Sequence, residues 1–295
     1  MKIKESAGRK IFNVFNILFL GAVALTCLLP FMNILAISFS NSAAAAANEV
    51  KFWPVGFNVK SYAFAIGNPA FLRSFGVAFL RLLIGVPINM ILMVLVAYPL
   101  SKPKREFRAR NFYVWFFLIT VLFNAGTVPW FLTIKAAGLL DTIWALVIPG
   151  SLPVFNMIIL MNFFRGLPKE IEEAAYIDGA GHWATLFKIY LPLSVPSLAT
   201  VMLFSIVNHW NSWFDGMMLM NSPDNYPLQT YLRTVVIDLD TMLMIARDNP
   251  QILGFVNERT SRSAQMFISL IPIFLIYPFL QKYFTTGLVM GSVKG

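Results

Sequence analysis

The chain alternates between long apolar stretches and short polar segments. Six stretches are long enough to cross a bilayer as helices, because a hydrocarbon core of about 30 Å needs roughly 20 apolar residues. They are residues 11–39, 74–99, 111–134, 142–164, 189–219 and 263–284. Inside them, the informative charges are Arg81 and Asp215. The pattern predicts an all-α integral membrane fold with six transmembrane helices.

Composition supports the same class. The chain is 58% hydrophobic and 13% charged, whereas soluble domains average about 45–50% and 25%. The net charge of +9 does not indicate a nucleic-acid partner, because Lys and Arg gather at the termini and between apolar runs and form no basic face. A single cysteine, Cys27, allows neither an intrachain disulfide nor a cysteine metal cluster.

The distribution of Lys and Arg predicts the orientation in the membrane. The segments that connect the apolar stretches alternate between the two sides of the membrane. Lys and Arg are most frequent in the segments on one side, which are 2–10, 102–110, 165–188 and 282–294. By the positive-inside rule, both termini and the 165–190 loop are cytoplasmic, and residues 221–262 are extracytoplasmic. The first apolar run exceeds the roughly 7–15 residues of a signal-peptide core. We therefore expect a cytoplasmic N-terminus over 1–10 and one multi-span domain over 11–295.

Proline and glycine inside the stretches predict local irregularities. Membrane helices tolerate them where neighbouring groups satisfy the freed backbone. We expect kinks at prolines and local unwinding around Pro129 and Pro149-Gly150. The extracytoplasmic segment 221–262 is expected to form a small cap with short helices, for example around 227–236.

The polar segment 165–190 predicts a helical hairpin on the inner face. Pro168 suits a helix start, and the acidic residues at 170, 172 and 173 fall near the positive end of the helix dipole. Gly179 and Gly181 can turn the chain at little steric cost, and a second short helix is expected over 182–190. Without further information, an amphipathic hairpin that only caps the bundle explains this pattern.

A spaced motif in this hairpin favours a more specific interpretation. Glu173-Ala174-Ala175 is followed after three residues by Gly179, and after nine more by Ile189-Tyr190-Leu191-Pro192. This spacing resembles the EAA loop of importer-type ABC permeases. Further runs extend the resemblance to the carbohydrate-type, MalG-like family and its LplC/YtcP-type branch: residues 97–101, 123–129, 138–142, 162–170, 210–214, 226–229 and 287–295.

The resemblance implies an ABC type I importer permease in the bacterial plasma (inner) membrane. It implies a second homologous permease, a dimeric ABC ATPase, an extracytoplasmic solute-binding protein and surrounding membrane lipid as partners. The ATPase-coupling residues would be Glu173, Ala174, Ala175, Asp178, Gly179, Ile189 and Pro192. Glu173 would pair with a basic ATPase residue. The chain has no phosphate-binding loop motif, so ATP and Mg would be bound by the partner, with no cofactor, metal or catalytic residue here.

Candidate residues for the sugar pathway combine amides, aromatic rings and one carboxylate. Asn208, Asn211 and Asp215 fall at i, i+3 and i+7, so a continuous helix would place them on one stripe. The remaining candidates at this outer level are Trp210, Trp213, Asn124 and Trp130. The alternative is an interfacial aromatic belt with amides joining helices.

Arg81 predicts the class of sugar. An arginine inside a span costs about 2.5–3.5 kcal/mol at the helix centre, so it should face the bundle or a wet cavity. Attraction of an acidic sugar, such as an alginate or pectin fragment, is one interpretation, and Arg73 on nearly the same face supports it. Snorkelling to the headgroups, or pairing with a carboxylate such as Asp215, is the other. Neutral oligosaccharides also fit the family.

Two other function classes have weaker support. An ion-coupled secondary transporter needs acids as relays, yet Asp215 is the only acid and His209 the only histidine in the apolar stretches. A membrane enzyme needs clustered catalytic groups, and two histidines with one cysteine offer no such arrangement.

Overall fold

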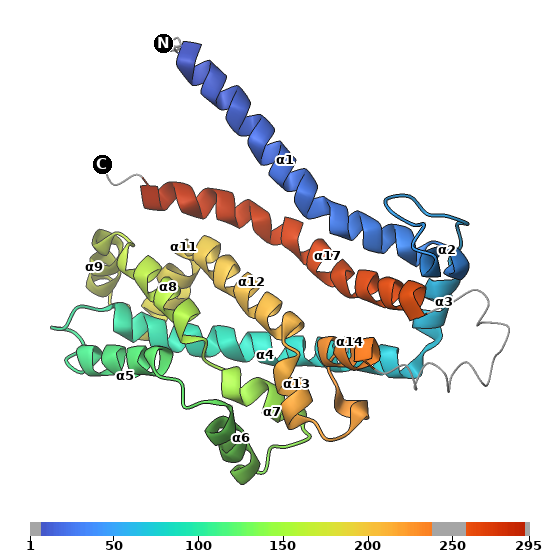
Figure 1. The fold of residues 1–295 in the computed structure, drawn as a ribbon. Helices are drawn as coiled ribbons and strands as arrows, with labels where there is room; N and C mark the ends of the chain where they lie inside the picture. Colours follow the sequence, from blue (N-terminus) through green and yellow to red (C-terminus); the bar gives the residue numbers. More distant parts are fainter. Residues whose placement is uncertain (1–6, 238–257, 293–295) are drawn as a thin grey trace. The chain divides into compact units, whose positions relative to one another are not determined.

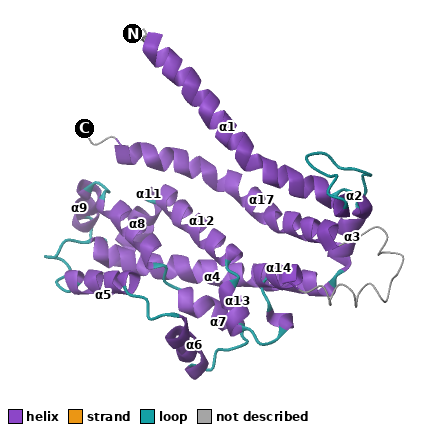
Figure 2. Ribbon diagram, in the orientation of Figure 1, coloured by secondary structure: helices purple, strands orange, loops and turns teal. Residues whose placement is uncertain are grey.

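The computed structural model describes residues 7–237 and 258–292, which form helices and loops with no strand in those ranges (Figure 1, Figure 2). The chain divides into two compact units. One comprises residues 1–69 and 234–270, and the other comprises residues 70–233 and 271–295.

The first unit contains α1 (Ala7–Ser38), α2 (Ser42–Ala46), α3 (Lys60–Gly67) and the beginning of α17 (Glu258–Ser292). The side chain of Asn41 accepts a hydrogen bond from the Ala43 amide over 2.7 Å and starts α2. Arg259 donates to the Ala45 carbonyl over 2.9 Å and so ties α17 to the end of α2. The most apolar window of α1 has no buried residue, so this helix presents an apolar surface to a membrane or a partner.

The second unit is built around α4 (Pro69–Ser101), its longest helix. Its main core packs one face of α4 against α8 and α12 and includes Met93, Leu160 and Val201, all buried. By contrast, α5 has no buried residue and is apolar on its exposed surface. The other elements are α5 (Arg110–Leu122), α6 (Thr127–Ala136), α7 (Ile143–Val147), η1 (Ile148–Gly150), α8 (Val154–Arg165), α9 (Lys169–Ile177), α10 (His182–Thr185), η2 (Leu186–Tyr190, a π-helix), α11 (Leu191–Leu193), α12 (Val195–Asn211), α13 (Phe214–Leu219), η3 (Pro223–Asn225) and α14 (Leu228–Ile237).

The predicted stretches are helical, but several are not single straight helices. In the described residues, α1 and α4 are each long and apolar enough to cross a membrane, and counting three bent helix pairs as single spans raises the number to five. The sixth predicted stretch, 263–284, lies within α17. The all-α membrane class is confirmed, and the number six stays a prediction.

The third stretch, 111–134, was wrongly predicted as one helix. It consists of α5 and α6, whose axes differ by 116°. The side chain of Asn124 accepts a hydrogen bond from the Gly126 amide over 2.8 Å, and Gly126 adopts a φ of 87°. This local turn precedes Pro129, which lies inside α6, so the expected break at that proline is displaced toward the N-terminus. The break near Pro149-Gly150 is confirmed by the 3-10 turn η1.

The fifth stretch, 189–219, also departs from one helix. The helical segment that ends at Leu193 and α12 meet at 81°, and α12 ends at Asn211. Ser212 is extended, with φ −71° and ψ 121°, before α13 begins. The predicted short helix around 227–236 is confirmed by α14. The rest of the predicted cap, from 238 to 257, lies outside the described residues.

Candidate functional site

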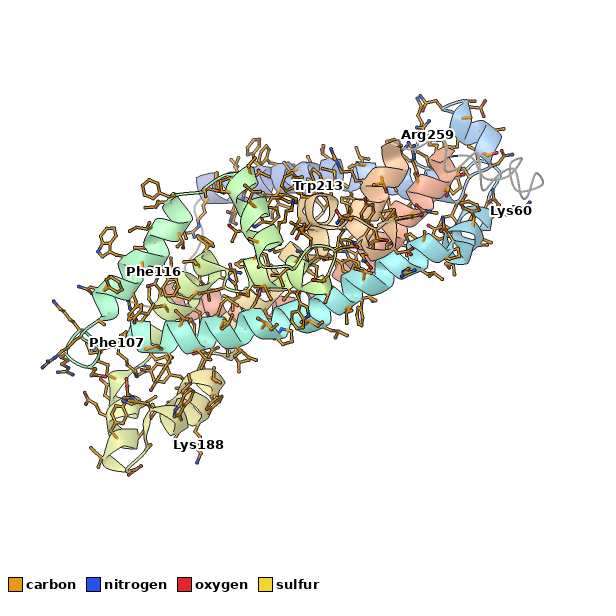
Figure 3. All side chains as sticks on the ribbon, turned by 90° about the horizontal axis from the view of Figure 1, so that it is seen from below. Lys60, Phe107, Phe116, Lys188, Trp213 and Arg259 are labelled. Atoms are coloured by element: carbon orange, nitrogen blue, oxygen red, sulfur yellow. The ribbon has the colours of Figure 1, made fainter. Side chains whose placement is uncertain are left out.

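The helical hairpin predicted at 165–190 is present. Helix α9 follows Pro168, and α10 begins at His182. Between them, Gly179 adopts a φ of 81°, a left-handed conformation that glycine adopts without strain. Gly181, also expected to turn the chain, has an ordinary φ of −77°. In Figure 3 the hairpin extends beyond the end of α4, with Lys188 projecting from it and Phe107 in the α4–α5 turn.

Most predicted coupling residues lie on the hairpin surface. Glu173, Ala174, Asp178 and Gly179 are exposed, whereas Ala175 is buried. The last two, Ile189 and Pro192, lie where the hairpin leads into α12, with Ile189 half-buried and Pro192 exposed. The acidic and small residues of the motif therefore lie where a partner can reach them.

Large apolar side chains accompany this motif on the hairpin. Ile177 is 86% exposed at the end of α9. Trp183 and Phe187 are also exposed and stack on each other, with ring centroids 6.0 Å apart. Exposed aromatic residues at one site are typical of protein interfaces. Sequence reasoning missed these three residues, although their apolar character in a polar loop was a visible signal.

Where the hairpin meets the end of α4, Lys102 and Glu172 form an ion pair that sequence reasoning also missed. The Lys102 ammonium additionally donates to the Tyr190 hydroxyl over 3.0 Å. Glu172 accepts hydrogen bonds from the Tyr190 hydroxyl over 2.6 Å and from the Tyr176 hydroxyl over 2.9 Å. The rings of Tyr98 and Tyr190 each lie with their centroid 4.3 Å from the Lys102 nitrogen. We call these five residues the inner cluster.

The environment of the inner cluster shifts its acid–base equilibria. Burial raises the pKa of Glu172, but hydrogen bonds from Lys102, Tyr190 and Tyr176 outweigh it, so the Glu172 pKa lies below its ordinary value. Burial lowers the pKa of Lys102, and the neighbouring carboxylate opposes that shift. Burial and the Glu172 carboxylate raise the pKa of Tyr176. Glu172 is therefore ionised at neutral pH.

A second ion pair joins Arg81 of α4 to Asp215 of α13. The Arg81 guanidinium donates to both carboxylate oxygens, over 3.2 Å from Nη1 to Oδ1 and through a shorter contact from Nη2 to Oδ2. Ser212 Oγ donates to Asp215 Oδ1 over 2.7 Å. The structure thus contains the pairing of Arg81 with a carboxylate that the sequence offered as one interpretation of this arginine.

His209 and Asn89 complete this arrangement. Arg81 Nε donates to His209 Nδ1 over 3.2 Å, so the imidazole accepts at Nδ1 and carries its hydrogen on Nε2. Nε2 lies 3.1 Å from the Asn89 amide. With the Asn89 oxygen turned toward His209, its nitrogen donates to the Gly85 and Ser151 carbonyls over 3.1 Å and 3.0 Å. Arg81, Asp215, His209 and Asn89 form what we call the outer cluster.

Gly85 allows the outer cluster to form. A Cβ at this position of α4 would lie 2.8 Å from both Cε1 and Nε2 of His209. Real Cβ atoms do not approach that closely, so the imidazole occupies space that only glycine leaves open.

The predicted amide stripe is wrong in its third member. Asn208 and Asn211 are exposed on α12, but the helix ends at Asn211 and the extended Ser212 redirects the chain. Asp215 consequently faces Arg81 and does not continue the stripe. The i, i+3, i+7 argument failed because it assumed one continuous helix.

The aromatic candidates lie in different environments. Trp210 is only 2% exposed and packs edge-on against Phe75 with centroids 5.6 Å apart, so it offers no ring face to a sugar in this conformation, and its role in the pathway stays a prediction. Trp213 is half-buried, with the Arg233 guanidinium 4.0 Å from its ring centroid. Trp130 packs beside a small core that contains Ile134.

Asn124 is exposed and shapes the turn before α6 through its bond to Gly126. In residues 7–237 and 258–292, no group of three or more His, Cys, Asp or Glu side chains could hold a metal ion.

Comparison with known proteins adds a family context to this geometry. A family model described as "Binding-protein-dependent transport system inner membrane component" matches residues 61–289. Protein LplC of Bacillus subtilis (strain 168) is 39% identical over 289 residues, covering 98% of this chain and 96% of LplC. The polygalacturonan/rhamnogalacturonan transport system permease protein YtcP of the same organism is 36% identical over 280 residues, covering 94% of this chain and 96% of YtcP.

A solved structure is also similar. One chain in the crystal structure of a bacterial ABC transporter involved in the import of the acidic polysaccharide alginate has a TM-score of 0.86 and 32% sequence identity. The match covers 96% of the present chain and 100% of that chain. The similarity therefore extends over both units of the fold.

Proposed function

The chain belongs to the family of binding-protein-dependent transport system inner membrane components, and on this premise we propose that it is the subunit through which an ATP-driven importer passes acidic oligosaccharides. The chain is a sugar ABC importer permease, a non-catalytic membrane subunit, as its family and relatives show. In this proposal the sugar is acidic and a dimeric ATPase docks on the hairpin. A second related permease and an extracytoplasmic binding protein complete the transporter.

The exposed face of the hairpin is the observation that best supports docking of the ATPase. Glu173 supplies a charge, Ala174 leaves room for close approach, and Ile177 with Trp183 and Phe187 supplies apolar area. Such a combination of aromatic anchors and a charged rim fits recognition by another protein. The ATPase partner would bind ATP and Mg, because this chain carries no phosphate-binding loop motif.

Reversal of one charge tests the docking. We expect Glu173→Arg to abolish co-purification of the ATPase from native membranes, because a basic partner residue would meet a like charge. Glu170→Arg is the matched control, since Glu170 is also exposed on α9 and lies outside the motif. Equal recovery of the ATPase with both variants would contradict docking through Glu173.

The acidic class of sugar rests on relatives and on one residue. YtcP is named for polygalacturonan and rhamnogalacturonan, and the solved importer is described as acting on alginate; uronate carboxylates are common to such polymers. Arg81 is the candidate to attract these carboxylates, by exchanging Asp215 for the sugar during transport. The guanidinium geometry suits either carboxylate partner.

Neutral oligosaccharides are the second candidate, and a specific observation favours them. Arg81 is already neutralised by Asp215 and is almost fully buried, so no free positive charge is offered from this position. The paired variant Arg81→Met/Asp215→Asn removes both charges together. If the proposal holds, this variant loses uptake of uronate oligomers in proteoliposomes with the ATPase and binding protein. Unchanged uronate uptake by the variant would show that Arg81 does not attract the sugar, whereas wild-type protein that imports neutral oligosaccharides and no uronate oligomers would establish the neutral class.

An ion-coupled secondary transporter finds no support in these contacts. Asp215 is the only acid within the predicted spans, and it is held by Arg81. Uptake that depends on ATP and persists without an ion gradient is the expected result in the same proteoliposomes.

A further inference from the structure

Lys102 is unusually enclosed for a residue that directly follows a membrane helix. Its side chain is 5% exposed, although α4 ends one residue earlier at Ser101. A flexible ammonium at such a position normally extends into water. Here Glu172 and two tyrosine rings surround it, which bonds the hairpin to the chain directly after α4.

Capping of α4 does not explain this enclosure. The carbonyl of Leu100, in the last turn of α4, accepts hydrogen bonds from Arg110 Nε over 3.1 Å and from Arg165 Nη2 over 3.0 Å. These two guanidiniums already provide the positive charge that favours a helix C-terminus. Lys102 instead points its charge at α9 and η2, the two helical segments of the hairpin that contribute Glu172 and Tyr190.

Through the inner cluster, both helical segments of the hairpin therefore bond to the end of α4. Glu172 and Tyr176 come from α9, Tyr190 comes from η2, and Tyr98 and Lys102 come from the end of α4. The exposed residues Glu173 and Ile177 follow directly on α9, on the surface that the cluster leaves free. A pull on that surface must either move α4 or break the cluster.

Helix α4 connects this cluster with the outer one. It runs without interruption from Pro69 to Ser101 and carries Arg81. About 30 Å of helix, at 1.5 Å per residue, separates Arg81 from Lys102. A displacement of the inner end of α4 is thus carried by a continuous helix to the residues around Arg81.

We propose that the Lys102–Glu172 cluster is the mechanical link that transmits movement of the hairpin to α4 and so couples ATP hydrolysis to sugar passage. The inference rests on the proposed function, because it assumes that the ATPase docks on the hairpin. Lys102, Glu172 and Tyr190 are positioning residues in this scheme: they touch neither nucleotide nor sugar, and they act by holding two moving parts together.

The test is the number of sugar molecules imported per ATP hydrolysed by the complete transporter in proteoliposomes. Lys102→Met/Glu172→Gln removes both charges and leaves no buried charge without a partner. We expect ATPase co-purification and ATP hydrolysis to persist, while uptake per ATP falls about 10-fold, within the usual range of coupling between sites. Arg105→Gln is the matched control, since Arg105 lies in the same region with a side chain 78% exposed.

A second variant keeps the test decisive if the double variant fails to assemble. Tyr190→Phe keeps the ring that faces Lys102 and removes only the hydroxyl that binds Lys102 and Glu172. We expect uptake per ATP to fall about 3-fold, in line with the loss of a hydrogen bond. Uptake per ATP equal to wild type, in either variant that assembles, overturns the link.

The outcome for the wild-type protein separates this inference from the proposed function. If no ATPase co-purifies with the wild-type protein, or if that protein imports sugar without ATP, the proposed function fails and no variant needs to be made. If wild-type transport is ATP-driven and the variants remain fully coupled, the proposed function stands and only the link is wrong.

Discussion

Two buried ion pairs attach to α4, one through Arg81 within the helix and one through Lys102 directly after its end, and they are built from different chemistry. In the outer cluster the side chains of Arg81 and Asp215 are 3% and 16% exposed, and in the inner cluster those of Lys102 and Glu172 are 5% and 15% exposed. Burial is therefore nearly equal. The outer pair is surrounded by the polar groups of His209 and Asn89, whereas the inner pair is surrounded by tyrosines.

The difference lies in how much each geometry constrains its partners. A planar guanidinium bound to both oxygens of a carboxylate has a defined orientation, and His209 restrains it further through Nε. An ammonium is a point charge with three rotatable donors, and the faces of aromatic rings attract it from many angles. The outer cluster is thus suited to hold α4, α12 and α13 in one arrangement, and the inner cluster is suited to stay bonded while the hairpin moves.

Removal of one partner from each ion pair should give the largest difference in stability loss between the two clusters. Arg81→Met leaves Asp215 inside a predicted span without a counterion, and we expect a loss of about 3–5 kcal/mol of stability, typical of a broken buried pair. Lys102→Met should cost less, because Glu172 keeps the hydroxyls of Tyr176 and Tyr190. Thermal inactivation of the detergent-purified protein measures both effects.

The control for this comparison is Arg81→Met/Asp215→Asn, which removes the orphaned charge. It should recover most of the stability that Arg81→Met loses. A double variant as unstable as the single one would mean that the two residues do not act as a pair.

A methyl group added at Gly85 should disturb the outer cluster alone. Gly85→Ala places a Cβ against the His209 ring, and overpacking of this kind costs about 1–3 kcal/mol. Gly76→Ala is the matched control on α4, because no atom lies within 4 Å of its added Cβ; it should be neutral or raise stability by up to about 1 kcal/mol. Equal melting temperatures for both variants would contradict the close approach of His209.

Acid should release the inner cluster only at low pH, which is the smallest of the three effects. The folded-state pKa of Glu172 is depressed, so its contribution is present above the ordinary carboxyl value of 4.5 and is lost as the pH falls through the lower folded-state pKa. The protection factors of the hairpin amides, which are exchange rates corrected for the intrinsic pH dependence of amide exchange, should therefore be constant from pH 7 to 5 and fall at lower pH, whereas Glu172→Gln should remove that fall. Protection factors that already fall between pH 7 and 6 would show that Glu172 is not held as described.

The local features of the hairpin were predictable because they depend on neighbouring residues. The helix after Pro168, the turn at Gly179 and the exposed Glu173 all follow from propensity and spacing along a short segment. The amide stripe that included Asp215 was not predictable in the same way. Its prediction required α12 to continue beyond Asn211, and the extended Ser212 decides otherwise.

The amino-acid sequence by itself determined the membrane class, the apolar stretches, the helical hairpin and the family, since hydropathy and motif spacing are properties of contiguous residues. Only the tertiary structure decided the partners of the buried charges: Asp215 lies 134 positions from Arg81, and Glu172 lies 70 positions from Lys102. It also buried Trp210 and bent the third stretch by 116°. Partners at such separations are chosen by how the helices pack, because a buried charge must find an opposite charge wherever packing brings one within reach.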